Sequence, residues 1–175
     1  DEKAALLDQS YYQLLRLVNN LSAAAVYLNS DKPLPLQDRD MVDTVRELCA
    51  QAEGPAVLLG LELRFVCSRS QHICAFHQPS LELLVQHLLS NAFKYTPEGG
   101  HIDVSLTRGT DPDAVEEPLR NYFEIRVTDN GCGIPWEQQE GLFRHGESAS
   151  GIGLANTWRR LQLYYGSDFS LCCES

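Results

Sequence analysis

The sequence predicts an α+β fold in which one mixed sheet carries its helices on one face, preceded by a long N-terminal helix. Three observations support this: a heptad pattern near the start, a proline-containing break after it, and strand-like runs alternating with helical patterns from residue 36 onward. The 175 residues, 43% of them hydrophobic, are enough for one domain with a sizeable core plus one extra element. We therefore expect a helical element at 1–30 and a separate domain at 36–175.

The N-terminal segment is predicted to be a helix that packs lengthwise against a partner. Its apolar residues recur at steps of four and three: Leu7, Tyr11, Leu14, Val18, Leu21, Ala25 and Leu28. This spacing is typical of a bundle or coiled coil, with an ordinary amphipathic core helix as the alternative. A helix of roughly 28 residues spans about 42 Å, more than the width of a small domain, so we expect it to need a partner. Pro33 and Pro35 end it.

The domain from residue 36 onward is predicted to begin with a helix. Asp38 is expected to cap this helix, which runs to about Glu53 and closes at Gly54–Pro55. Two short strand-like runs follow, at 61–67 and 72–77, with a polar turn between them.

A second helix and several strands complete the predicted pattern. The second helix opens at Pro79–Ser80 and reaches Tyr95, just before another proline. The remaining elements are strands at 101–106, 122–128 and 169–173, and a last helix from about 154 to 165.

Charge and composition exclude several classes of function. Acidic residues number 24 and basic residues 14, a net charge of −10, so the chain lacks a large basic footprint for nucleic acid or an anionic membrane. A small anionic ligand remains compatible, because a metal ion and backbone N–H groups can neutralise it locally. The six cysteines form no C-x-x-C pair and are interpreted as reduced thiols of a cytoplasmic protein. No apolar run is long enough to span a membrane and no leader opens the sequence, so we expect a soluble fragment.

The second helix is predicted to carry a polar stripe beside its buried face. Its apolar arc consists of Leu84, Val85, Leu88 and Ala92. The adjoining arc consists of His87, Asn91, Lys94 and Tyr95. An amide oxygen at Asn91 suits Mg²⁺, and the Lys94 ammonium suits a phosphate, although a solvated helix face is the simpler interpretation.

A glycine-rich turn follows the 122–128 strand, with the sequence Asp-Asn-Gly-Cys-Gly-Ile-Pro from Asp129 to Pro135. Asn-Gly after a strand is a common hairpin signal, but no alternating strand follows here. Gly131 and Gly133 would let backbone approach a flat ligand closely. A carboxylate such as Asp129 can accept the amino group of adenine, whereas guanine presents an oxygen at that position.

A second glycine pair, Gly151 and Gly153, opens the last helix just before Leu154. Such a pair brings the N–H groups of a helix N-terminus against phosphate oxygens. The chain contains no G-x-x-x-x-G-K-[ST], which excludes a P-loop.

The order of these motifs resembles the Bergerat-type ATP-binding fold and, within it, the catalytic domain of bacterial sensor histidine kinases. The resemblance covers 36–175 nearly end to end. The matching segments are 87–97 for the N box, 129–135 for the G1 box, Leu142–Phe143 for the F box and 151–154 for the G2 box. The helix predicted at 1–30 resembles the second helix of the dimerisation and phosphoacceptor hairpin.

This resemblance implies ATP and Mg²⁺ as cofactors and transfer of the γ-phosphoryl group to a histidine. His87 and Asn91 are the catalytic candidates, with Asn91 as the Mg²⁺ ligand. Lys94 would contact the phosphates and Asp129 the adenine amino group. The other implied ATP-binding positions are Tyr95, Gly131, Gly133, Ile134, Phe143, Gly151, Gly153 and Leu154.

The sequence departs from the family pattern in three places. His87 stands where most such kinases carry Asn and the hydrolysing relatives carry Glu, which argues against a plain ATPase such as a chaperone-type relative. The lid between Phe143 and Gly151 is short, and Ala149 replaces the usual first glycine of the G2 box. No histidine lies in an H-[ED]-x-x-[TN]-P setting, so the acceptor is expected upstream, on the other hairpin helix.

The implied partners are that missing helix, a response regulator and, in the full-length protein, a second copy of the chain. The fragment is expected in the cytoplasm, with neither nucleic acid nor membrane as a partner. A nucleotide-binding regulatory module without kinase activity is the alternative function, favoured by the short lid and the altered boxes.

Overall fold

The computed structural model describes residues 35–110 and 121–135, together with 161, 162, 165, 170, 172 and 173. Residues 36–133 form one compact unit, and the other described residues belong to a second unit. The predicted N-terminal helix at 1–30 lies outside the described residues, as do Phe143, Gly151, Gly153 and Leu154. The elements that carry the fold are those of the first unit.

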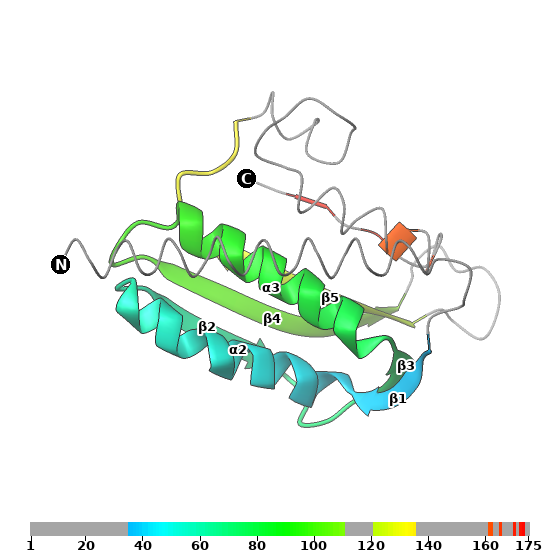
Figure 1. The fold of residues 1–175 in the computed structure, drawn as a ribbon. Coiled ribbons are helices and arrows are strands. Elements are labelled where there is room, and N and C mark those ends of the chain that lie inside the picture. The colour runs from blue at the N-terminus through cyan, green and yellow to red at the C-terminus, as the bar shows by residue number, and fades with distance from the viewer. Residues whose placement is uncertain are drawn as a thin grey trace. The chain divides into compact units, whose positions relative to one another are not determined.

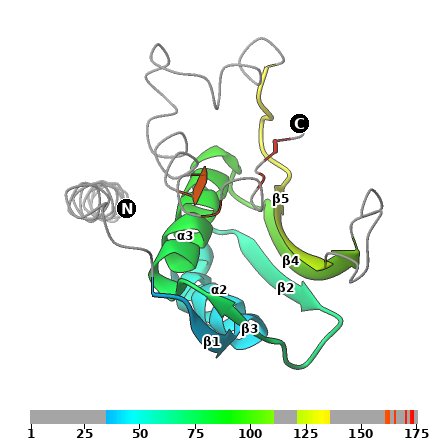
Figure 2. The same ribbon diagram turned by 90° about the vertical axis from the view of Figure 1, so that its right-hand side faces the viewer.

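A three-stranded sheet with two helices on one face forms this unit (Figures 1 and 2). Its strands are β2 (Glu62–Cys67), β4 (His101–Thr110) and β5 (Asn121–Asp129), in the order β2-β4-β5. β2 pairs parallel with β4, and β4 pairs antiparallel with β5. The helices are α2 (Met41–Leu58) and α3 (Gln78–Tyr95). This arrangement confirms the predicted α+β class, with a mixed sheet and helices on one face.

The hydrophobic core lies between the helices and the central strand β4. Ile102, Val104 and Leu106 of β4 are buried, whereas the residues between them are more exposed, as the period-two pattern predicts. The buried side chains facing them from the helices include Val42, Val45, Leu48, Val85, Leu89 and Ala92. β4 therefore fixes which face of the sheet is the inner one.

A second sheet, not expected from the sequence, pairs β1 (Gln37–Asp40) with β3 (Ile73–Phe76) in an antiparallel manner. The two strand-like runs at 61–67 and 72–77 are thus strands, but they lie in different sheets. The His72 ring packs against the Phe123 ring of β5, with centroids 4.3 Å apart.

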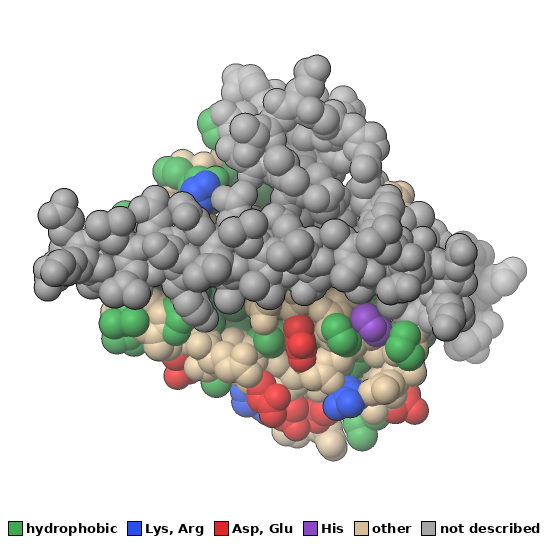
Figure 3. Space-filling model, in the orientation of Figure 1, with side chains coloured by type: hydrophobic (Ala, Val, Ile, Leu, Met, Phe, Trp, Pro, Cys, Tyr) green, Lys and Arg blue, Asp and Glu red, His purple; other side chains and the backbone are tan. Residues whose placement is uncertain are grey.

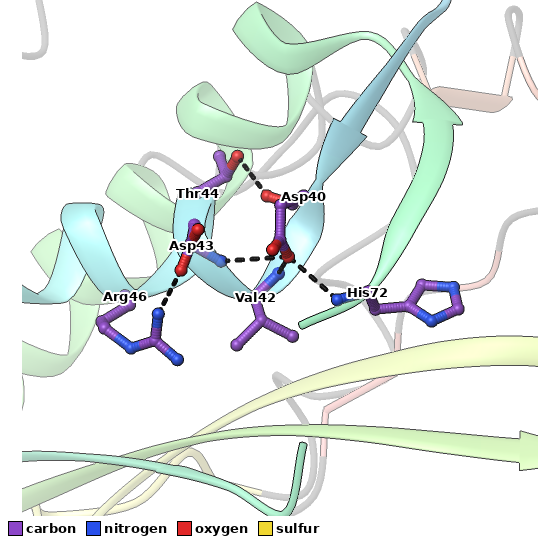
Figure 4. A network of polar contacts seen from close by, with 6 residues as sticks. All are labelled: Asp40, Val42, Asp43, Thr44, Arg46 and His72. Carbon is purple, nitrogen blue, oxygen red and sulfur yellow. Dashed lines mark hydrogen bonds and ion pairs between the residues drawn. The ribbon is translucent and has the colours of Figure 1, made fainter. Parts of the chain in front are cut away.

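The start of α2 corrects the predicted cap. The N-cap is Asp40, not Asp38, because 37–40 are held in the strand pair with β3 and the helix begins only after them. Asp40 Oδ1 accepts hydrogen bonds from the N–H groups of Val42 (3.0 Å), Asp43 (3.4 Å) and, across the chain, His72 (3.0 Å) (Figure 4). The His72 bond, ahead of the two cap bonds, lowers the pKa of the Asp40 carboxyl below its ordinary value, and burial opposes it.

The end of α2 also differs from the prediction, since Gly54 and Pro55 lie inside the helix. The helix ends instead in a Schellman motif, in which Leu61 N–H bonds Ala56 O (2.9 Å) and Gly60 N–H bonds Val57 O (3.0 Å). Gly60 takes the left-handed conformation that this motif requires, with φ +68°. Proline removes one helix N–H, yet the helix continues past Pro55 to the closure at which Ala56 and Leu61 are buried.

The exposed side chains of this unit are mixed: charged residues lie beside exposed hydrophobic ones such as Val57, Leu58 and Ile73. Figure 3 shows acidic side chains beside a few basic ones on the face drawn there. The exposed side of α2 includes Asp43 and Arg46, which form an ion pair with each other.

The described residues near the C-terminus agree only partly with the prediction. Leu161, Gln162 and Tyr165 are helical, in agreement with the predicted last helix. Ser170, Cys172 and Cys173 are in no strand, and the other residues of the predicted strand at 169–173 lie outside the described residues. In the part of the chain that is described, no helix is long and apolar enough to cross a bilayer.

Candidate functional site

The polar stripe predicted on the second helix is present on α3. Asn91, Lys94 and Tyr95 are exposed and His87 is half-buried. On the neighbouring arc Leu84, Val85 and Ala92 are buried and Leu88 is half-buried, as the helical spacing predicts. α3 therefore presents an amide, an ammonium and a phenol along one accessible edge.

Lys94 and Tyr95 hold each other at the end of α3. Lys94 Nζ donates to the Tyr95 hydroxyl at 3.0 Å and lies 4.7 Å from the centroid of its ring. A cation in the last turn of a helix also interacts favourably with the helix dipole. The ammonium is thus held in place while still exposed to solvent, the state needed to meet an anionic ligand.

Asp129 lies on the same face of the sheet as α3. It is the last residue of β5, and its partner on β4 is Ile102, which is fully buried under the helices. Residues directly opposite each other on paired strands point to the same face. The exposed Asp129 carboxylate therefore leaves the sheet on its helix-covered side.

The turn after Asp129 packs onto the end of α3. Gly131 N–H donates to Asp129 Oδ1 at 2.9 Å, and Cys132 N–H donates to the last carbonyl of α3, Tyr95 O, at 3.4 Å. A Cβ on Gly131 would lie 2.5 Å from Tyr95 O and 2.6 Å from Asp129 Oδ1. Gly133 has φ +71°, a left-handed conformation that favours glycine. Glycine is therefore required at both positions for structural reasons: at Gly131 by the close approach of α3, and at Gly133 by the left-handed backbone.

Asn91 and the Asp129 turn both lie near the C-terminal end of α3. Asn91 lies one helical turn before Tyr95, about 6 Å along the helix axis, and Tyr95 carries the Asp129 turn. Ile134 is half-buried and belongs to the second unit.

Neither a metal-ligand cluster nor the hollow beside the end of α2 marks the candidate site among the described residues. Among the residues placed in the structure, no three His, Cys, Asp or Glu side chains gather as a metal cluster. A hollow of about 410 Å³ lies beside the end of α2, lined by residues such as Val57, Leu61 and Gly100 and by none of the predicted site residues.

Sequence reasoning missed the contacts that hold the Asp129 turn from the other side. Asn130 bonds the backbone of His101, and Gly100 packs against both Asn130 and Thr96. The only sequence signal was the glycine pair at 99–100, which by itself indicates no more than a lead into a strand.

The comparisons with known proteins point to one family. Residues 76–175 match the family described as histidine kinase-, DNA gyrase B-, and HSP90-like ATPase. The sensor histidine kinase Hik2 of Thermosynechococcus vestitus is 32% identical over 139 residues, which cover 73% of this chain and 34% of that protein.

Solved structures share the fold. Full-length ShkA in complex with AMPPNP gives a TM-score of 0.63 at 20% identity, covering 89% of this chain and 31% of that one. Histidine kinase ThkA in complex with the response regulator TrrA gives 0.57 at 16% identity, covering 79% and 39%.

This chain spans less than half of the length of curated relatives such as Hik2. The family match nevertheless covers more than half of the chain and includes α3, β5 and the Asp129 turn. The chain thus belongs to the histidine kinase-, DNA gyrase B- and HSP90-like ATPases and is, within them, a sensor histidine kinase catalytic domain.

Proposed function

We propose that this chain binds ATP with Mg²⁺ at the edge formed by α3 and the Asp129 turn, and transfers the γ-phosphoryl group to a histidine outside 1–175. The observation that carries the proposal is the contact between Cys132 N–H and Tyr95 O. This contact joins the Asp129 turn, whose carboxylate would read the purine, to α3, whose polar stripe would face the phosphates. Both lie on the same face of the sheet.

Each side chain at this edge has a role that its chemistry suits. Asp129 accepts the adenine amino group with a charged hydrogen bond. Lys94, held beside Tyr95, meets the phosphates as a point charge, and Tyr95 lines the nucleotide site. Gly131 and Gly133 keep the turn tight enough for the backbone to pass close to the base.

The residues also suit a magnesium ion that is held mainly by the nucleotide. Asn91 offers an accessible hard amide oxygen, and the surrounding residues form no acidic metal cluster among those the structure describes. Mg²⁺ at nucleotide sites keeps several waters and takes few protein ligands besides the phosphates. There it would neutralise charge that develops on the transferring phosphoryl group.

The reaction needs positioning more than covalent chemistry from the protein. Phosphoryl transfer depends mainly on alignment and on neutralising charge at the phosphate oxygens. His87 replaces the glutamate that would activate water in a hydrolysing relative, so a histidine acceptor fits this edge better than water does.

The remaining parts of the proposal fall outside the described residues. Phe143 anchors the lid, and Gly151, Gly153 and Leu154 close the helix N-terminus on the phosphates. The acceptor lies on the missing hairpin helix, the whole protein is a homodimer, and it passes the phosphoryl group to a response regulator in the cytoplasm. The structural neighbour ThkA, solved with the response regulator TrrA, supports such a partner.

The short lid at 144–150 favours a second candidate, a nucleotide-binding regulatory module without kinase activity. Mixing the chain with Mg-ATP and a separate hairpin fragment carrying the acceptor histidine separates the candidates. Phosphoryl transfer supports the kinase, and tight binding without transfer supports the regulatory module. Steady phosphate release would indicate an ATPase instead.

The site itself is tested by Asp129→Asn in calorimetry with Mg-ATP. We expect nucleotide affinity to fall by about 1.5–3 kcal/mol, the scale of a charged hydrogen bond. Asp38→Asn is the matched control, because Asp38 is an exposed carboxylate on β1, the strand labelled at the opposite end of α3 in Figure 1. Equal affinity for the two variants would remove Asp129 from the adenine site.

A further inference from the structure

Three segments meet beside the proposed adenine site, two of them joined by a short turn and the third distant in sequence. They are the C-terminal end of α3, the start of β4 and the end of β5. Thr96, the C-cap of α3, bonds back to Ala92 O through its hydroxyl at 2.6 Å. Gly100 N–H donates to Pro97 O at 2.9 Å, which turns the chain from α3 into β4.

Asn130 ties the end of β5 to the start of β4 by two hydrogen bonds. His101 N–H donates to the side-chain oxygen Oδ1 of Asn130 at 2.9 Å, and Asn130 N–H donates to His101 O at 3.3 Å. With one side-chain bond and one backbone bond, Asn130 continues the pairing of β4 with β5 one residue beyond Asp129, the last paired residue of β5.

Gly100 lies close to Asn130 and to the end of α3. A Cβ on Gly100 would lie 2.3 Å from Thr96 Cγ2, 2.7 Å from Asn130 Oδ1 and 2.8 Å from Pro97 O. Only a residue without a side chain at position 100 therefore allows the three segments to meet.

Asn130 also stands between the two residues that orient the proposed site. Asp129 precedes it, and Gly131, which follows it, is pressed against the last carbonyl of α3. A shift at residue 130 would therefore move the Asp129 carboxylate relative to α3.

We propose that Asn130 is a positioning residue: by holding the start of β4, it fixes the Asp129 carboxylate in the orientation that reads the amino group of adenine. This inference rests on the proposed function, because it concerns the purine selectivity of that same site. It assigns part of this selectivity to Asn130, whose side-chain oxygen accepts a hydrogen bond from the His101 backbone. Without the Asn130 side chain, the turn loses the 2.9 Å bond from His101 N–H. The bonds that remain to it are the Asp129–Gly131 bond and two longer backbone contacts, Asn130 N–H to His101 O at 3.3 Å and Cys132 N–H to Tyr95 O at 3.4 Å.

The test compares Asn130→Ala with Asn130→Asp in calorimetry with Mg-ATP and Mg-GTP. In the alanine variant we expect ATP affinity to fall about tenfold, or 1.4 kcal/mol, with GTP affinity nearly unchanged, so that discrimination between the purines falls. The aspartate variant retains an acceptor oxygen for His101 N–H and is expected to restore most of that discrimination.

Two controls separate positioning from a general loss of stability. Thr128→Ala, an exposed polar residue on the same strand, is expected to leave both affinities unchanged. Urea unfolding of each variant without nucleotide measures stability independently. If the alanine variant does not fold, Asn130→Ser answers the same question, because its shorter side chain loses the 2.9 Å bond.

The outcomes distinguish this inference from the proposed function. Failure of the unsubstituted chain to bind ATP overturns both. ATP binding that Asp129→Asn weakens but Asn130→Ala leaves alone overturns the positioning role only. The positioning role is also overturned, without loss of the proposed function, if Asn130→Ala weakens ATP and GTP equally or if Asn130→Asp restores no discrimination.

Discussion

The helices α2 and α3 have the same length, 18 residues each, and pack on the same face of the sheet, but their ends are built differently. At the start of α2 the carboxylate of Asp40 caps the helix and accepts hydrogen bonds from three backbone N–H groups. At its end a Schellman motif at Gly60 closes it over buried Leu61. Both ends of α2 are thus satisfied by neighbouring structure.

α3 has a weaker start and an end that contacts the candidate site. Its N-cap residue, His77, makes no side-chain cap bond to the backbone; the His77 ring bonds the Ser80 hydroxyl instead, at 2.7 Å. At its other end the Tyr95 carbonyl accepts Cys132 N–H from the Asp129 turn. Both helices contribute to the core, but the difference between their ends indicates that the two ends of α2 serve stability whereas the C-terminal end of α3 also holds the candidate site. Substitutions at these ends should therefore have separable effects.

The largest expected difference concerns two cysteines, one in each region. Burial, with a smaller contribution from the negative charge of Glu53, raises the pKa of the Cys49 thiol on α2 to about 11. Cys132, in the turn on α3, is exposed. At about pH 8 only about one Cys49 in a thousand is thiolate, so we expect Cys132 to react with iodoacetamide at least about a hundredfold faster.

Mass spectrometry of peptides after timed labelling measures both rates in one sample. Mg-ATP is expected to slow the labelling of Cys132 and to leave Cys49 unchanged, while urea releases Cys49. If Cys49 in the folded chain were labelled as fast as Cys132, Cys49 would not be buried on α2 as the structure shows.

Removal of the α2 cap is expected to have the next largest effect. Asp40→Ala leaves the N–H groups of Val42, Asp43 and His72 without their acceptor. Losing a cap and a charged hydrogen bond together is expected to lower the free energy of unfolding by about 3 kcal/mol. Urea unfolding measures it, with Asp43→Ala as the control, since the exposed Asp43–Arg46 pair contributes little.

The same carboxylate predicts how stability depends on pH. Because folding lowers the pKa of Asp40 from 3.8, its contribution is fully present above that unfolded value and is lost as the pH falls toward the folded one. The stability difference between the unsubstituted chain and Asp40→Ala should therefore shrink when the pH is lowered from about 6 to about 3. A constant difference over that range would contradict the assignment.

How far the sequence predicts this molecule depends on the range of the contacts involved. Spacing within one helix or strand was enough for the polar stripe at Asn91 and for the inward side of β4. The cap of α2 was not predictable, because pairing of 37–40 with the distant strand β3 chooses Asp40 over Asp38. Pro55 was misinterpreted for a similar reason, since the closing contact with Leu61 lies beyond the helix. Asn130 acts on His101, 29 positions away, and no local pattern reports such a bond.

Two matched glycine substitutions refine the comparison at the helix ends. Gly131→Ala places a Cβ against Tyr95 O and Asp129 Oδ1, so the turn has to move away from α3. We expect ATP affinity to fall about tenfold, or 1.4 kcal/mol, because the carboxylate that reads adenine moves with the turn. Calorimetry with Mg-ATP measures this, and an unchanged affinity would show that the docking of the turn does not matter for the site.

Gly60→Ala, at the end of α2, is expected to have the smallest effect, on stability alone. Gly60 has φ +68°, so alanine would be strained there, while its Cβ would meet only the flexible Glu98 side chain, with Cγ at 2.8 Å. We expect the free energy of unfolding to fall by about 1 kcal/mol, the scale of a left-handed glycine replaced by alanine. ATP affinity should stay within the error of calorimetry, because this helix end contacts neither Asn91 nor the Asp129 turn directly. A loss of affinity as large as that of Gly131→Ala would mean that the two helix ends act as one structural unit.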